Sequence, residues 1–126
     1  MAKILVVEDD ATNLEIASRF LRLRGYDVVS AHDGPSAVAQ ALAEKPDLIL
    51  MDMKLPHAGD GQAATRAIRA QPSLGSVPII ALTAQAMPVE IDDMFAAGCD
   101  DVETKPFNFA QLHGKIEKLL AARSQR

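Results

Sequence analysis

The sequence is poor in the residues that support several common kinds of protein chemistry. It has one cysteine, no tryptophan and one tyrosine among its 126 residues, and Lys and Arg total 13 against 17 for Asp and Glu. The single cysteine, Cys99, excludes an internal disulfide and is typical of a small core residue in a reducing, cytoplasmic setting. The formal net charge of -4 disfavours non-specific binding to nucleic acid or to anionic lipid.

Long hydrophobic runs are also absent. The first apolar run, from Ile4 to Val7, is short and is interrupted at once by Glu8. A signal peptide needs an apolar region of about 7 to 15 residues, so the sequence predicts neither export nor a membrane anchor.

The composition fits one globular domain. Hydrophobic residues make up 48% of the chain and charged residues 24%, which is too apolar for disorder and too interrupted for a membrane span. Domains most often contain about 100 to 150 residues. We therefore expect residues 1–126 to form a single domain.

Short apolar runs alternate with stretches of helical periodicity along the whole chain. This alternation predicts an α/β fold, and the nearly continuous apolar runs favour a parallel sheet that is covered on both faces. Five runs and right-handed crossovers fit a doubly wound sheet of strand order 2-1-3-4-5 with five helices, as in flavodoxin-like folds. The expected strands are 4–7, 28–31, 48–51, 77–82 and a weak fifth at 102–104.

Capping residues, prolines and glycines delimit the expected helices. The first begins after a cap at Thr12 or Asn13 and ends at Gly25. The others run from near Pro35 to Lys45, over 62–70, from near Pro88 to Gly98, and from a cap at Asn108 almost to Arg126, with 123–126 expected to fray.

Acidic residues follow two strands that are neighbours in this strand order. Glu8, Asp9 and Asp10 come directly after the first strand, and Asp52 ends the third, so we expect their carboxylates to converge on one cleft. Like charges at such distances demand a cation, and an all-oxygen site suits Mg²⁺. The alternative is that strand-end acids merely cap helix N-termini, and for Asp10 alone we favour that interpretation.

Two hydrogen-bond donors follow other strands at the same edge. Thr83 comes after the fourth strand and Lys105 after the fifth, and a hydroxyl with an ammonium can bind an oxyanion. Together with the acids they predict a carboxylate that accepts a phosphoryl group beside a divalent cation.

Four motifs in order carry a resemblance to a known family. They are Ile4-Leu-Val-Val-Glu-Asp-Asp10, Leu50-Met-Asp-Met-Lys-Leu-Pro56, Ala81-Leu-Thr-Ala84 and Lys105-Pro-Phe107. Together they resemble a response regulator receiver domain over essentially the whole chain, of the stand-alone CheY or DivK type without an output domain. The resemblance implies a CheY-like fold and a protein of two-component signal transduction.

The resemblance also implies a role for each acid. Asp52 is then the phosphoacceptor, and it binds Mg²⁺ or Mn²⁺ together with Asp9, Glu8 and the main-chain carbonyl of Lys54. Glu8 acts through metal-bound water. Lys54 and Gln85 flank the line of attack of the hydrolytic water and set the lifetime of the phosphoryl group, for which we expect slow to moderate self-dephosphorylation.

The remaining implied residues concern binding of the phosphoryl group and the response to it. Thr83 and Lys105 contact the phosphoryl group, the loop that begins at Ala84 shifts in response, and the peptide bond before Pro106 is cis. Many receivers carry an aromatic switch residue where this chain has Val102. We therefore expect the signal to pass through 84–97.

The implied function is to accept a phosphoryl group from a histidine kinase or a histidine phosphotransfer protein, without a separate enzymatic activity. The output is a target protein bound by the face of the fourth helix, fifth strand and fifth helix, with the chain a monomer or weak dimer in the cytoplasm.

Two other functions are disfavoured by the residues. A phosphohydrolase is disfavoured because Lys54 is no general acid. A flavodoxin-like cofactor binder is disfavoured because the loop after the first strand is acidic. A receiver that acts only as a phosphorylation-independent interaction module remains the alternative.

Overall fold

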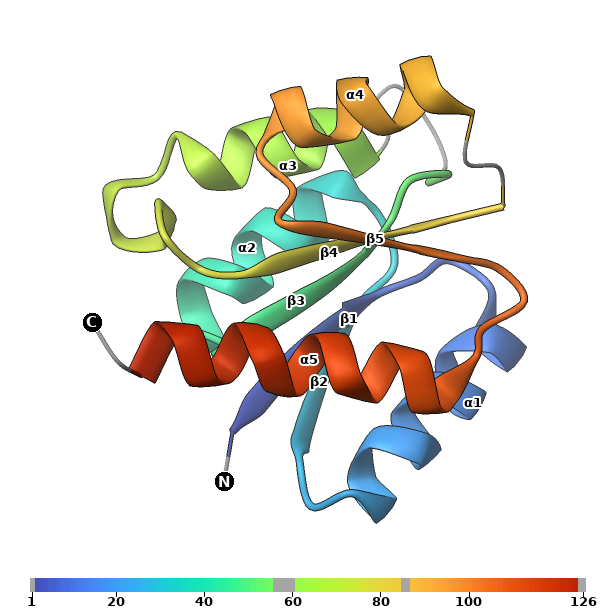
Figure 1. Ribbon diagram of the computed structural model, residues 1–126. Coiled ribbons are helices and arrows are strands. Elements are labelled where there is room, and N and C mark those ends of the chain that lie inside the picture. The colour runs from blue at the N-terminus through green and yellow to red at the C-terminus, as the bar shows by residue number, and fades with distance from the viewer. Residues whose placement is uncertain (1, 56–60, 85–86, 125–126) are drawn as a thin grey trace.

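Five parallel strands form the centre of the fold in the computed structural model, which describes residues 2–55, 61–84 and 87–124 (Figure 1). Their order is β2-β1-β3-β4-β5, which confirms the predicted topology. The strands are β1 (Lys3–Val7), β2 (Asp27–Ala31), β3 (Leu48–Asp52), β4 (Ile79–Thr83) and β5 (Asp101–Thr104).

Helices cover both faces of the sheet. Helices α1 (Ala11–Leu23) and α5 (Phe109–Ser124) lie on one face, and α2 (Gly34–Glu44), α3 (Gly61–Arg69) and α4 (Pro88–Ala97) lie on the other (Figure 1). A short 3₁₀ helix, η1 (Pro72–Leu74), follows α3. Within the described ranges, no helix combines the length and the apolar character that crossing a lipid bilayer requires.

The central strands are buried on both sides because their alternate side chains enter two separate cores. Leu5, Ile49 and Ile79 belong to the core beneath α2, α3 and α4. Their neighbours in the chain, such as Ile4 and Leu48, belong to the core beneath α1 and α5. This double burial explains why the strands appear in the sequence as continuous apolar runs.

The start of α1 corrects the sequence prediction. Asp10 is the N-cap, and its carboxylate accepts a hydrogen bond of 2.9 Å from the main-chain N–H of Asn13. Thr12 and Asn13 therefore lie inside the helix, and the prediction that one of them caps it is wrong. The capping role that we favoured for Asp10 is confirmed, and an acid there also interacts well with the positive end of the helix.

Two further boundaries differ from those expected. Residues Val77 and Pro78 lie outside β4, since the Val77 N–H bonds Leu74 and a proline has no N–H to donate to the sheet. At the C-terminal end of α5, Arg123 is not frayed. Its Nη1 donates hydrogen bonds to the main-chain oxygens of Asp47 (2.7 Å) and Pro46 (3.3 Å).

Candidate functional site

The candidate site lies where β1 and β3 end side by side. Val7 pairs with Met51 in the parallel register, so Glu8 and Asp9 emerge next to Asp52. From these strand ends the chain continues to α1 on one face of the sheet and to α3 on the other (Figure 1), and a parallel sheet binds ligands at such a topological switch point. The resulting cleft has a volume of about 310 Å³.

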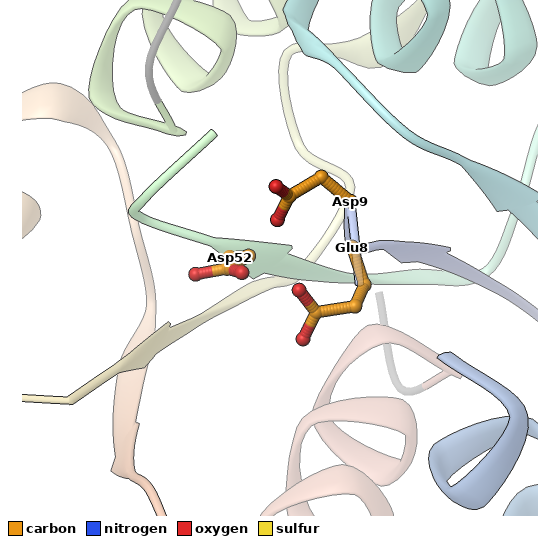
Figure 2. Close-up of side chains that lie close together, drawn as sticks. All are labelled: Glu8, Asp9 and Asp52. Carbon is orange, nitrogen blue, oxygen red and sulfur yellow. The ribbon is translucent and has the colours of Figure 1, made fainter. Parts of the chain in front are cut away.

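Three carboxylates gather in this cleft. Glu8, Asp9 and Asp52 each offer an oxygen that lies within 4.8 Å of the other two, and Figure 2 shows the three side chains together. Glu8 is 3% exposed and Asp52 2% exposed, whereas Asp9 is exposed to solvent. Three carboxylates in a partly buried cleft form the hard, all-oxygen donor set that Mg²⁺ prefers. The residues therefore fit a divalent cation.

Lys105 supplies the positive charge of the cleft. Its Nζ lies 3.1 Å from Glu8 Oε1 and 3.0 Å from Asp52 Oδ2. The residue directly follows β5, its main-chain N–H donates to the carbonyl of Thr83, and its peptide bond to Pro106 is cis. One ammonium facing three carboxylates leaves the site with excess negative charge, which favours a cation.

The buried acid beside Asp52 has a perturbed ionisation. Burial raises the pKa of Glu8 to about 7, and a hydrogen bond with Asp52 and its charge add to this effect, while Lys105 opposes it. Burial by itself would lower the pKa of Lys105, but the pairs with Asp52 and Glu8 outweigh it and leave that pKa raised. Lys105 is therefore an ammonium at neutral pH.

The segment after Asp52 completes one side of the cleft. The main-chain N–H of Lys54 donates a 3.0 Å hydrogen bond to Asp52 Oδ1, which orients the carboxylate. Lys54 and Ala84 both line the cleft. Thr83 is buried at the end of β4 and lines an adjoining cavity of about 450 Å³, which shares Lys54 and Ala84 with the cleft.

The other predicted residues take different places. Asp10 lines the cleft but caps α1 and is not one of the three clustered acids. Val102 is half-buried on β5 and packs against the core beneath α2, α3 and α4. Pro106 lines a third cavity beside α1. Gln85 lies outside the described residues.

Sequence reasoning missed two features of this region. Asn13 lines the cleft, although we considered it only as a helix cap. The sequence feature that could have indicated this is the position of Asn13 three residues after Asp10, because it places Asn13 on the first turn of the helix that borders the site. The ion pair between Glu8 and Lys105 was also missed, since only the fold brings together residues so distant in the chain.

Comparison with known sequences gives a family match over nearly the whole chain. Residues 4–117 match the family described as response regulator receiver domain. The transcriptional regulatory protein PrrA of Mycobacterium tuberculosis is 37% identical over 124 residues, which cover 96% of this chain and 51% of PrrA. The chain thus spans about half the length of this curated relative.

Solved structures of similar fold include a magnesium-bound one. The receiver domain of the sensor histidine kinase PA1611 from Pseudomonas aeruginosa PAO1, with a magnesium ion coordinated in its active site cleft, is 41% identical. It has a TM-score of 0.88 over 95% of this chain and 98% of that one. The chemotaxis protein CheY4 of Vibrio cholerae is 31% identical, with a TM-score of 0.89 over 94% of this chain and 98% of that one.

Proposed function

The chain belongs to the response regulator receiver domain family of two-component systems, and we propose that it accepts a phosphoryl group on Asp52 in a Mg²⁺-dependent reaction. The donor is a phosphohistidine of a histidine kinase or of a histidine phosphotransfer protein. The observation that carries the proposal is the convergence of Glu8, Asp9, Asp52 and Lys105 in one cleft. The magnesium ion in the related PA1611 receiver domain supports it further.

The metal would be held by Glu8, Asp9, Asp52 and the main-chain carbonyl of Lys54, with Glu8 acting through water. When bound, Mg²⁺ or Mn²⁺ supplies positive charge that offsets the charge of the phosphoryl oxygens. The burial of Glu8 and Asp52 supports this assignment, because the single ammonium of Lys105 offsets only part of the repulsion among the clustered carboxylates.

The protein groups perform the transfer by positioning and charge. An oxygen of the Asp52 carboxylate attacks the phosphorus, a P–O bond forms, and the P–N bond to the donor histidine breaks with its electron pair leaving on nitrogen. The Lys54 N–H holds Asp52 Oδ1, which leaves Oδ2 as the attacking oxygen. Lys105 contacts Oδ2 and is placed to pair with an oxygen of the incoming group.

The signal would leave the site through β4 and α4. Thr83 contacts the phosphoryl group, the segment from Ala84 shifts, and α4 follows, while Val102 provides no ring to move. The exposed apolar side chains of Val89 and Phe95 on α4 support a target protein docking at the face of α4, β5 and α5.

The wider setting of the chain is also part of the proposal. We propose that it acts as a receiver without a separate enzymatic activity, in the cytoplasm, as a monomer or weak dimer that binds no nucleic acid. The acidic net charge supports the proposal that the chain binds no nucleic acid. Lys54 and Gln85 set the lifetime of the phosphoryl group.

Intact-mass analysis after incubation with a small phosphodonor tests the proposal. The expected result is an adduct of one phosphoryl group that requires Mg²⁺ and is lost in Asp52→Asn. Asp27→Asn, at the opposite end of the sheet, is the matched control and should be phosphorylated like the wild type. If neither the phosphodonor nor candidate kinases yield an adduct, the result would favour the phosphorylation-independent interaction module.

A further inference from the structure

At the start of α3, two stretches of backbone pack against each other with no side chain between them. Gly61 is the first residue of α3 and is buried against the end of β3. A Cβ on Gly61 would lie 2.6 Å from Met53 Cα and 2.8 Å from Met53 Cε, and closer still to the carbonyl oxygen of Asp52. Backbone atoms cannot swing aside as a flexible side chain does. Any residue other than glycine therefore has to displace this segment.

Hydrogen bonds to α3 and to β4 also fix Met53 at this contact with Gly61. The Gly61 N–H donates to the carbonyl of Met53 at 3.2 Å, and the Met53 N–H donates to the carbonyl of Leu82 on β4 at 2.9 Å. The Gly61 carbonyl in turn accepts a 2.7 Å hydrogen bond from the hydroxyl of Thr65, which is fully buried. Met53 is thus fixed between the first turn of α3 and the end of β4.

The two residues that flank Met53 are both functional in the proposed reaction. Asp52 precedes it and Lys54 follows it, and the Lys54 N–H bonds the Asp52 carboxylate. We propose that Gly61 is a positioning residue for the metal and phosphoryl site, because its missing side chain lets α3 hold the Asp52–Lys54 segment in place. This inference rests on the proposed function, since the Lys54 carbonyl is assigned as a metal ligand there.

Gly114 and Gly75 lack this contact and provide controls. A Cβ on Gly114, within α5, would meet no atom within 4 Å. On Gly75 the nearest atom would be the carbonyl oxygen of Pro72, at an ordinary 3.9 Å. Gly114→Ala is the better control, because it also replaces a helical glycine and should leave the fold intact.

The test measures Mg²⁺ affinity by NMR titration of backbone amides, without a phosphodonor and well below each variant's melting temperature. Gly61→Ala should bind Mg²⁺ at least tenfold more weakly than the wild type, and Gly114→Ala should bind it equally well. Combining Gly61→Ala with Met53→Ala should not restore binding, because the contacts with the main chain remain. Mg²⁺ affinity of folded Gly61→Ala within twofold of the wild type overturns the inference.

A second pair of variants decides the matter should Gly61→Ala not fold. Thr65→Val removes the donor to the Gly61 carbonyl and should weaken Mg²⁺ binding several-fold, whereas Thr65→Ser keeps the hydroxyl and should restore it. If Thr65→Val lowers only the melting temperature and leaves Mg²⁺ affinity unchanged, the contact is merely structural and the inference is wrong. A wild type that binds Mg²⁺ but accepts no phosphoryl group would instead contradict the proposed function.

Discussion

Mg²⁺ binding should depend on pH through Glu8. This carboxyl is 3% exposed, and burial raises its pKa to about 7, with Asp52 adding to the shift. A metal site requires the ionised acid, so protons compete with Mg²⁺ below that pH. From pH 6 to pH 8 the ionised fraction of Glu8 rises from about 10% to about 90%, and the apparent Mg²⁺ affinity should therefore rise roughly tenfold.

The same group links the stability of the metal-free protein to pH. Its pKa in the folded state lies above the ordinary value of 4.5, so the folded state binds more protons than the unfolded state between these values. The contribution of Glu8 to the free energy of unfolding is then fully present below about pH 4.5 and is lost as pH rises through about 7. The shift from 4.5 to about 7 limits this loss to about 3 kcal/mol.

Two measurements test this reasoning. Calorimetric titration with Mg²⁺ at pH 6, 7 and 8 gives the affinity, and urea denaturation at the same pH values without metal gives the free energy of unfolding. Glu8→Gln should flatten both profiles and raise the stability of the metal-free protein at pH 8. An unchanged pH dependence in Glu8→Gln, or an affinity that does not vary with pH in the wild type, would refute the assignment.

Three substitutions outside the acid cluster test which interactions stabilise the fold. Arg69→Gln removes an ion pair with Asp100 and hydrogen bonds to main-chain oxygens. It should lower the free energy of unfolding in urea by about 2 to 4 kcal/mol. The control Arg66→Gln, at an exposed position, should change that free energy by less than about 0.5 kcal/mol. Lys115→Met removes the ammonium that lies 2.9 Å from the buried carboxylate of Glu103, and should lower the free energy of unfolding in urea by about 3 kcal/mol. Adding Glu103→Leu should restore most of this free energy. No recovery in the double variant would contradict a buried ion pair. Asp10→Ala removes the cap of α1 and should cost about 1 kcal/mol in thermal melts followed by circular dichroism, so an unchanged melting temperature would argue against capping.

Local patterns predict most of the architecture because each strand is buried on both faces. Runs such as Leu48 to Met51 are apolar throughout, and helical periodicity separates them, so strand order follows from the handedness of the crossovers. Element ends are less predictable, since one hydrogen bond decides them. The Asp10 carboxylate determines the start of α1, and the missing N–H of Pro78 fits the later start of β4.

The candidate site was predictable in its members and not in its contacts. Strand-end positions place Glu8, Asp9 and Asp52 at one edge of a parallel sheet, and the structure brings their oxygens within 4.8 Å. The distance between Lys105 and these acids depends on the path of the chain after β5, which periodicity does not describe. Thr83 lines the adjoining cavity, which shares Lys54, Leu55 and Ala84 with the cleft.

The sequence by itself determined the fold class, the strand order and the identity of the acids, because these depend on residue type and on spacing along one stretch of chain. Tertiary structure alone decided the burial that raises the pKa of Glu8 and the pairing of Lys105 with two acids. It also decided the contact of Gly61 with the backbone of Asp52 and Met53. Each of these joins residues from different elements, and such distances are set only when the elements pack together.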